Sequence, residues 1–230
     1  MKIITAILIA TCYLIPHSHA TTIEGVEADL HFSEAYHIDD FKTSNQYLTV
    51  VPERVRFPRG KQKAKFEKAL AILEEVLNSD EFKKLVLTYT RGDGQRLYVK
   101  NYLWNDSDKL LTNEDVYNII MAGDERMRPD TLGVMNLNAR IRKCSWFKSK
   151  VSVWCRKVIG STNPRSSEVM TLNWKFYRNY EIPNMVSNIV HEWIHLLGFL
   201  HGSKNMNQEV PYVVGRIAGL VAKDILARDP

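Results

Sequence analysis

The chain has 230 residues, of which 45% are hydrophobic and 25% are charged, and its formal net charge is +5. This is a globular composition, with enough apolar residues for one sizeable core and a small second lobe. It excludes a protein with several membrane spans, because no stretch after the first twenty residues is apolar enough to cross a bilayer.

The first twenty residues have the pattern of a secretory signal. Lys2 precedes an apolar run from Ile3 to Ile15, and small residues lead to a cleavage site after Ala20. This run is too short for a membrane anchor, which needs about 20 apolar residues. We expect an exported protein, secreted or periplasmic, with no transmembrane segment in the mature chain. Residues 21–45 are polar and form either an N-terminal extension or a short pro-segment.

Residues 46–230 are expected to fold as a single domain. Apolar side chains alternate loosely over Gln46–Val51, which predicts a first strand. Between Gln62 and Asn78 they recur at intervals of three and four, which predicts an amphipathic helix. A second, short helix is expected after a cap at Ser79 and ends near Leu87.

The middle of the chain contains two more expected strands and a helix. Arg96–Leu103 and Val134–Ile141 have the residue types of strands. Thr112 and Asp115 are spaced like a capping box, so a helix is expected to begin there and to include Val116–Met121.

Cleavage of the signal leaves two cysteines, Cys144 and Cys155, between Val134–Ile141 and another strand-like segment, Val151–Ile159. An even pair in an exported chain predicts a disulfide, because export usually means an oxidising compartment. The alternative is two reduced cysteines packed as small hydrophobes. We expect the bond to staple a hairpin or a long loop.

The same region is strongly basic, because residues 132–167 contain no acidic residue. Its basic residues are Arg140, Arg142, Lys143, Lys148, Lys150, Arg156, Lys157 and Arg165, and its large aromatics are Trp146, Phe147 and Trp154. Such a surface can bind an anionic glycan, a cell surface or an acidic protein. The alternative, which we favour, is a solvated hairpin with half-buried aromatics. We expect no nucleic acid as a ligand of an exported protein.

A strand is expected at Glu168–Phe176, followed by a helix. Pro183 suits the first turn of a helix, and Asn184 or Ser187 can cap its start. The helix is expected to run to about Leu197, with one broad apolar face that anchors it.

The residues with the most demanding chemistry lie at the end of this helix. His191 and His195 are four residues apart and therefore share a helix face, so both imidazoles can bind one metal ion. Gly198 can adopt the left-handed backbone that ends a helix, which brings His201 back as a third ligand. Three protein ligands leave an open position for water, as in catalytic zinc sites. Beside them, Glu192 is placed to act as general base and then as general acid.

The pattern His-Glu-x-x-His-x-x-Gly-x-x-His resembles that of the metzincin zinc metalloproteases, and all five fixed positions match. The resemblance implies an α+β, metzincin-like zincin fold. Such a fold has a twisted mixed sheet with a backing helix and an active-site helix. A small C-terminal lobe, divided from the rest near residue 198, ends in a helix. Gly202, after the third histidine, matches none of the large metzincin families, so no subfamily is assigned.

The resemblance also implies further site residues. Met206 is the candidate for the methionine turn beneath the zinc ion, and Tyr212 is the candidate for an oxyanion-stabilising tyrosine. Residues 208–212 are expected to line the substrate pocket, and a closing helix is expected from Val213. A strand before the zinc helix forms the upper rim of the cleft in metzincins and pairs with substrate backbone. The expected rim residues are Val169, Met170, Thr171, Leu172 and Asn173.

The chain is therefore expected to be a monomeric, exported zinc endopeptidase with one catalytic Zn²⁺. It would hydrolyse peptide or protein substrates by attack of a zinc-bound water activated by Glu192. Two alternatives stay open. One is a zinc amidase that acts on a cell-wall peptide or glycopeptide. The other is a non-catalytic exported binding module that uses the basic aromatic segment 140–157.

Overall fold

A computed structural model describes residues 30–33, 41–43, 45–57, 60–91, 102–104, 111–125, 132–201 and 209–228. The expected signal peptide, most of residues 21–45, most of the expected strand Arg96–Leu103, and both Gly202 and Met206 lie outside these residues. The helices and strands, in chain order, are β1 (His31–Phe32), β2 (Thr49–Arg56), the 3₁₀ helix η4 (Gly60–Gln62), α1 (Lys63–Leu77), α2 (Asp80–Thr88), β3 (Tyr89–Thr90), α3 (Asn113–Ala122), β4 (Val134–Arg142), α4 (Trp146–Val151), α5 (Val153–Lys157), β5 (Gly160–Ser161), β6 (Met170–Asn173), α6 (Trp174–Tyr177), α7 (Ile182–Leu196) and α8 (Val210–Arg228).

A mixed sheet with the strand order β2-β4-β6-β5 lies at the centre of the fold. The pairs β2–β4 and β4–β6 are parallel, whereas β5 runs antiparallel to β6 and forms one edge. Along β4, Met135, Leu137 and Ala139 are fully buried, and exposed Arg140 and Arg142 flank buried Ile141. This alternation directs the apolar side chains of β4 to one face of the sheet.

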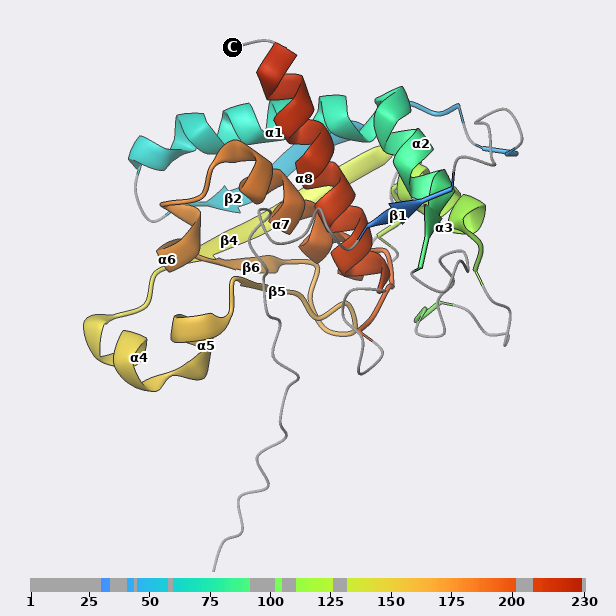
Figure 1. The fold of residues 1–230 in the computed structure, drawn as a ribbon. Helices are drawn as coiled ribbons and strands as arrows, with labels where there is room; N and C mark the ends of the chain where they lie inside the picture. Colours follow the sequence, from blue (N-terminus) through green and yellow to red (C-terminus); the bar gives the residue numbers. More distant parts are fainter. Residues whose placement is uncertain are drawn as a thin grey trace, which may run out of the picture.

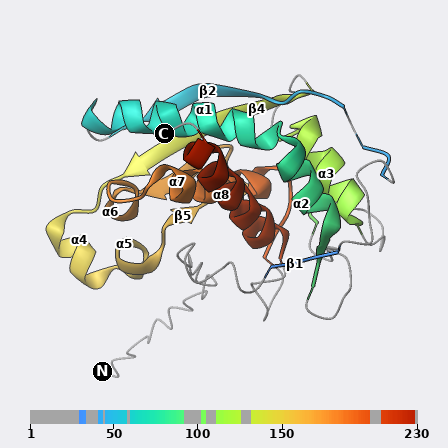
Figure 2. The ribbon, with the colours of Figure 1, turned by 45° about the horizontal axis from the view of Figure 1, so that its top comes forward.

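Two long helices cover that apolar face, and a third packs over them. Figures 1 and 2 show α1 and α7 lying across the same face of the sheet, with α8 crossing over both. The three helices pack against one another, and their apolar side chains share one hydrophobic core with β4 and β6. The chain therefore has the α+β class that the sequence predicts.

Local signals in the sequence explain α2 and α3. The Ser79 hydroxyl accepts a hydrogen bond from the Phe82 amide at 3.1 Å, which caps α2. Thr112 and Asp115 form the reciprocal hydrogen bonds of a capping box at the start of α3. Both predicted helix starts are confirmed, and so is the amphipathic helix α1.

The first strand of the sheet begins later than the sequence predicts, at Thr49, and continues to Arg56. The reason is a competing contact before the strand. The Leu48 amide donates to Asn78 Oδ1 at 2.8 Å, and Asn78 Nδ2 donates to the Leu48 carbonyl at 2.9 Å. Because Asn78 takes both backbone groups, Leu48 is anchored to the end of α1 instead of to a neighbouring strand.

The expected strand Val151–Ile159 is wrong, because this segment contains α5 and the end of α4. Serine hydroxyls cap both helices: Ser145 accepts from the Lys148 amide and Ser152 from the Cys155 amide. Cys144 and Cys155 are bonded, with an S–S distance of 2.03 Å. The predicted cysteine pair therefore staples two short helices and not a hairpin.

No helix in the described part of the chain combines the length and the apolarity that a bilayer crossing requires.

Candidate metal centre

The three histidines of the motif come together at the C-terminal end of α7. His191 and His195 lie on the last turns of the helix, and His201 follows it. One ligand nitrogen from each lies within 4.8 Å of the others. The Nε2 atoms of His195 and His201 are 3.1 Å apart. The histidine cluster that the spacing predicts is therefore present.

Gly198 turns the chain from the helix towards His201. Its φ is 101°, a left-handed conformation that side-chain-bearing residues rarely adopt. A Cβ at this position would also overlap the ring of Trp104. The Gly198 carbonyl accepts a hydrogen bond from the Leu103 amide at 2.8 Å. Residues 103 and 104 therefore close around the turn, and only glycine fits there.

Each imidazole is also anchored through hydrogen bonding to a neighbouring acceptor. His195 Nδ1 lies 2.6 Å from the Phe199 carbonyl, and His201 Nδ1 lies 2.7 Å from Glu209 Oε2. His191 donates to the backbone carbonyl of Pro211. A proton on Nδ1 of His195 and His201 leaves Nε2 with a free lone pair that faces the cluster. This is how outer-shell acceptors orient metal-binding histidines.

Electrostatics keep two of these rings neutral. Burial, reinforced by His195 and His201, lowers the pKa of His191 well below its usual value. Burial and the neighbouring His201 lower the pKa of His195 to about 4. Neutral imidazole is the form that binds a metal. The three converging nitrogens can therefore hold a metal ion, and three histidine nitrogens are a donor set that zinc accepts.

Glu192 is 2% exposed and points to the segment that follows β5. Its Oε2 accepts a hydrogen bond from the Thr162 hydroxyl at 2.7 Å. Burial raises the pKa of Glu192 to about 7, although the bond from Thr162 opposes this shift. A Cβ on Gly160 would come within 2.8 Å of Glu192 Cδ, so a glycine is needed beside the carboxyl. The group can thus gain or lose a proton near neutral pH.

The start of α8 forms the other wall of the centre. The ring of Tyr212 lies 4.5 Å from that of His191 and 4.9 Å from that of His201, between centroids. A Cβ on Gly215 would come within 2.8 Å of the Ser187 carbonyl and 3.1 Å of His191 Cβ. Gly215 therefore lets α8 approach α7 closely enough for Tyr212 to reach the histidines.

Two boundaries near the site differ from the sequence prediction. The closing helix begins at Val210 and not at Val213, so Tyr212 lies in its first turn. The α7 helix begins at Ile182 after Glu181, whose side chain makes no capping bond. The expected caps Asn184 and Ser187 are therefore wrong. The predicted place of Pro183 in the first turn is confirmed, and its fixed φ suits this position.

The expected rim strand lies inside the sheet and not at its edge. Val169 precedes β6, and the residues Met170, Thr171, Leu172 and Asn173 form it. Thr171 and Leu172 pair with β4 on one side and with Ser161 and Gly160 on the other. The backbone of β6 is thus already paired on both sides, and β5 is the edge strand beside it. Sequence analysis missed β5 because two residues, one of them glycine, carry almost no strand signal.

Three other site contacts escaped the sequence analysis. They are the contacts of Thr162 with Glu192, of Glu209 with His201, and of the Pro211 carbonyl with His191. No spacing rule connects these partners to the motif. Glu209 follows His201 by eight residues, a spacing that is not part of the pattern His-Glu-x-x-His-x-x-Gly-x-x-His. The expected methionine turn at Met206 lies outside the described residues.

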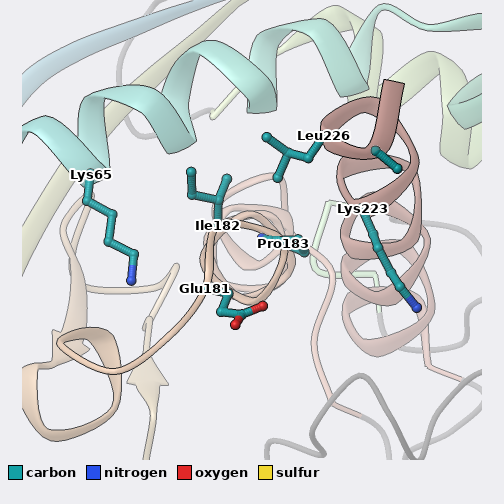
Figure 3. A pocket seen from close by; sticks show the side chains of 7 residues that line it. Lys65, Glu181, Ile182, Pro183, Lys223 and Leu226 are labelled. Carbon is teal, nitrogen blue, oxygen red and sulfur yellow. The ribbon is translucent and has the colours of Figure 1, made fainter. Parts of the chain in front are cut away.

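A pocket of about 460 Å³ lies elsewhere, at the N-terminal end of α7 (Figure 3). Its lining comes from the starts of α1 and α7 and the end of α8, namely Lys65, Glu181, Ile182, Pro183, Lys223, Leu226 and Ala227. From Ile182 to His195 the helix rises about 20 Å at 1.5 Å per residue. This pocket is therefore separate from the histidine cluster.

Comparison of the chain with protein-family models, with curated proteins and with solved structures gives no match. The assignment of function consequently rests on the geometry of the centre.

Proposed function

We propose that the protein is a zinc-dependent endopeptidase of metzincin type. The observation that carries the proposal is the set of three convergent histidines, adjacent to a buried carboxyl whose pKa is near neutral. Zinc would be held by His191, His195 and His201, and it would supply Lewis-acid chemistry that makes water nucleophilic near neutral pH. A purely structural zinc site has no need of Glu192 in this place.

Three residues of the chain would supply proton transfer, orientation of the carboxyl and stabilisation of the oxyanion. Glu192 takes a proton from the attacking water and delivers it to the departing amine, since its pKa of about 7 suits both directions of transfer. Thr162 fixes the orientation of the carboxyl through its hydroxyl. Tyr212 packs on two of the histidines and is the candidate donor to the oxyanion that forms at the scissile carbonyl.

A metzincin-like organisation is part of the proposal. In this view α1 is the backing helix, α7 is the active-site helix, and α8 is the closing helix of the C-terminal part. The antiparallel strand β5, at the edge of the sheet and directly before Thr162, takes the rim position that sequence analysis gave to residues 169–173. Met206 stays a prediction as the methionine of the turn.

Hydrolysis of a mixed peptide library tests the proposal. The samples are the native protein, the same protein stripped with a chelator, Glu192→Ala, and Glu75→Ala as an exposed control on α1. We expect cleavage by the native protein and by the control, loss after chelation, recovery with added zinc, and loss in Glu192→Ala although zinc remains bound.

Purified cell-wall fragments form a second arm of the test. Turnover of these fragments without cleavage of any peptide would assign the site to an amidase. A native protein that binds zinc but hydrolyses neither class would overturn the enzymatic proposal.

A further inference from the structure

The stapled arm, residues 143–157, contains α4 and α5 and carries an unusual apolar surface. Trp146 is 73% exposed, Phe147 67%, Val151 58% and Val153 41%. The other large exposed hydrophobic side chains in the described residues are scattered, at Phe32, Tyr47, Val51, Leu132 and Val169. These four side chains lie within eight residues, and we call them the apolar patch; exposed apolar side chains that are grouped, and not scattered singly, mark contact surfaces.

Positive charge surrounds this patch. Five exposed basic residues belong to the stapled arm: Lys143, Lys148, Lys150, Arg156 and Lys157. Exposed Arg140 and Arg142 precede it on β4, and no acidic residue occurs between 132 and 167 to neutralise them. Lys150 Nζ lies 3.9 Å from the centre of the Trp146 ring, so charge and aromatic surface are directly adjacent. The complementary partner is therefore anionic and has an apolar layer.

Backbone groups of the stapled arm have hydrogen-bond partners within the arm itself. Ser145 and Ser152 cap the two helices, and the Ser149 hydroxyl donates to the Trp146 carbonyl at 2.6 Å. Polar backbone groups with internal partners can approach a lipid interface at low cost. The bond between Cys144 and Cys155 holds the two helices together.

The arm is fixed to the sheet at its base. Figures 1 and 2 show α4 and α5 projecting from the body of the molecule beyond the end of β4. The side-chain Nδ2 of Asn173 donates to the carbonyls of Trp154 and Val158, at 3.2 and 2.8 Å. Trp154 Nε1 donates to Ser161 Oγ of β5 at 3.4 Å. The arm is thus hydrogen-bonded to β6 and to β5, the strand that precedes Thr162.

We propose that the stapled arm docks the protein on an anionic lipid surface. Trp146, Phe147, Val151 and Val153 enter the interface between headgroups and acyl chains, and the basic residues contact the lipid phosphates. A glycan or an acidic peptide would match the charges and the tryptophan. It would leave the two valines without a complementary surface, whereas an acyl layer accepts them. The proposal does not depend on the metal centre.

Vesicle sedimentation with the purified protein tests this proposal. The probes are vesicles of phosphatidylcholine alone and of phosphatidylcholine with phosphatidylglycerol. We expect binding to the anionic vesicles, weakened by salt because it depends on charge. Trp146→Ala/Phe147→Ala removes the two exposed aromatic side chains that would enter the interface, and it should reduce the partition coefficient by about tenfold or more. Lys148→Glu/Lys150→Glu should reduce it and weaken its salt dependence.

Matched variants away from the arm serve as controls. Val51→Ala/Leu132→Ala removes exposed apolar side chains, and Lys68→Glu/Lys84→Glu reverses exposed charges on α1 and α2. Both should bind vesicles within about twofold of the native protein. Circular dichroism confirms that every variant is folded. The proposal is overturned if the native protein does not bind anionic vesicles, if arm and control variants bind equally, or if only a soluble polyanion such as heparin is bound.

Discussion

The metal centre and the stapled arm both contact the short segment Gly160–Thr162, yet they are built in opposite ways. In the centre, polar side chains are buried, and each histidine has a specific acceptor. In the arm, apolar side chains are exposed, and the backbone is closed by serine caps and a disulfide. Buried polar groups need partners inside the chain. Exposed apolar groups of this size indicate a partner outside it.

The largest expected effect is on zinc affinity, which should depend on the metal centre and not on the stapled arm. His195→Ala removes a ligand nitrogen, so zinc affinity should fall by well over the 10–100-fold that loss of an outer partner costs. Lys148→Glu, in the arm, should leave zinc affinity within about twofold, because it changes no ligand and no acceptor. Competition with a zinc-binding dye measures both. Equal losses in the two variants would break the distinction between the regions.

A pH titration tests whether burial keeps His195 neutral. Its pKa is about 4 in the folded protein, against about 6.5 in an unfolded chain. The metal-free protein should therefore lose stability as pH falls from about 6.5 to 4, by up to about 3 kcal/mol for this group. Glu192 acts in the opposite sense, because its raised pKa makes the folded state bind a proton more tightly.

The contribution of Glu192 is removed by the substitution Glu192→Gln. The pH dependence of stability is then compared between this variant and the double variant Glu192→Gln/His195→Gln. Urea unfolding at each pH gives the free energy of unfolding. His195→Gln should reduce the fall in the free energy of unfolding at acid pH. Parallel curves for the two proteins would mean that His195 titrates normally in the folded state.

The close approach of α7 and α8 offers a test of packing around the centre. Gly215→Ala places a Cβ against the Ser187 carbonyl and should lower the free energy of unfolding by about 1–3 kcal/mol. Gly60→Ala is the matched control, since nothing lies within 4 Å of its Cβ position. Thermal unfolding of the two variants measures the difference. A stable Gly215→Ala protein would show that α8 does not need this close contact.

The smallest expected effect concerns the outer partner of His201. Glu209→Gln keeps a hydrogen-bond acceptor but removes a charge, so zinc affinity should fall by about tenfold, the lower end of the outer-shell range. Glu75→Gln, on the exposed side of α1, should have no effect. The same dye competition applies. Unchanged zinc affinity in Glu209→Gln would mean that the charge of Glu209 does not contribute to zinc binding.

Much of the helical framework was predictable, because its signals are local. The capping box of Thr112 and Asp115, the cap at Ser79 and the apolar period of α1 each act within a few residues. The spacing of His191, His195 and His201 is also a local pattern, since a helix and a glycine turn convert it directly into proximity.

What could not be predicted depends on contacts between distant segments. The β-branched residues of Val151–Ile159 favour a strand, but serine caps and the staple between Cys144 and Cys155 accompany helices there. Asn78, thirty residues from Leu48 along the chain, decides where β2 begins. Thr162 reaches Glu192 only because β5 lies at the sheet edge beside α7. No sequence period encodes these contacts.

The most direct test of the central claim is the rate of peptide hydrolysis per bound zinc, measured in parallel for the native protein and Glu192→Gln. The account predicts one zinc ion per chain in both proteins and a rate in Glu192→Gln that is about 10²–10⁴-fold lower, the usual contribution of a general acid–base group. Equal rates per bound zinc would contradict it, because the buried carboxyl next to His191 would then have no part in the reaction.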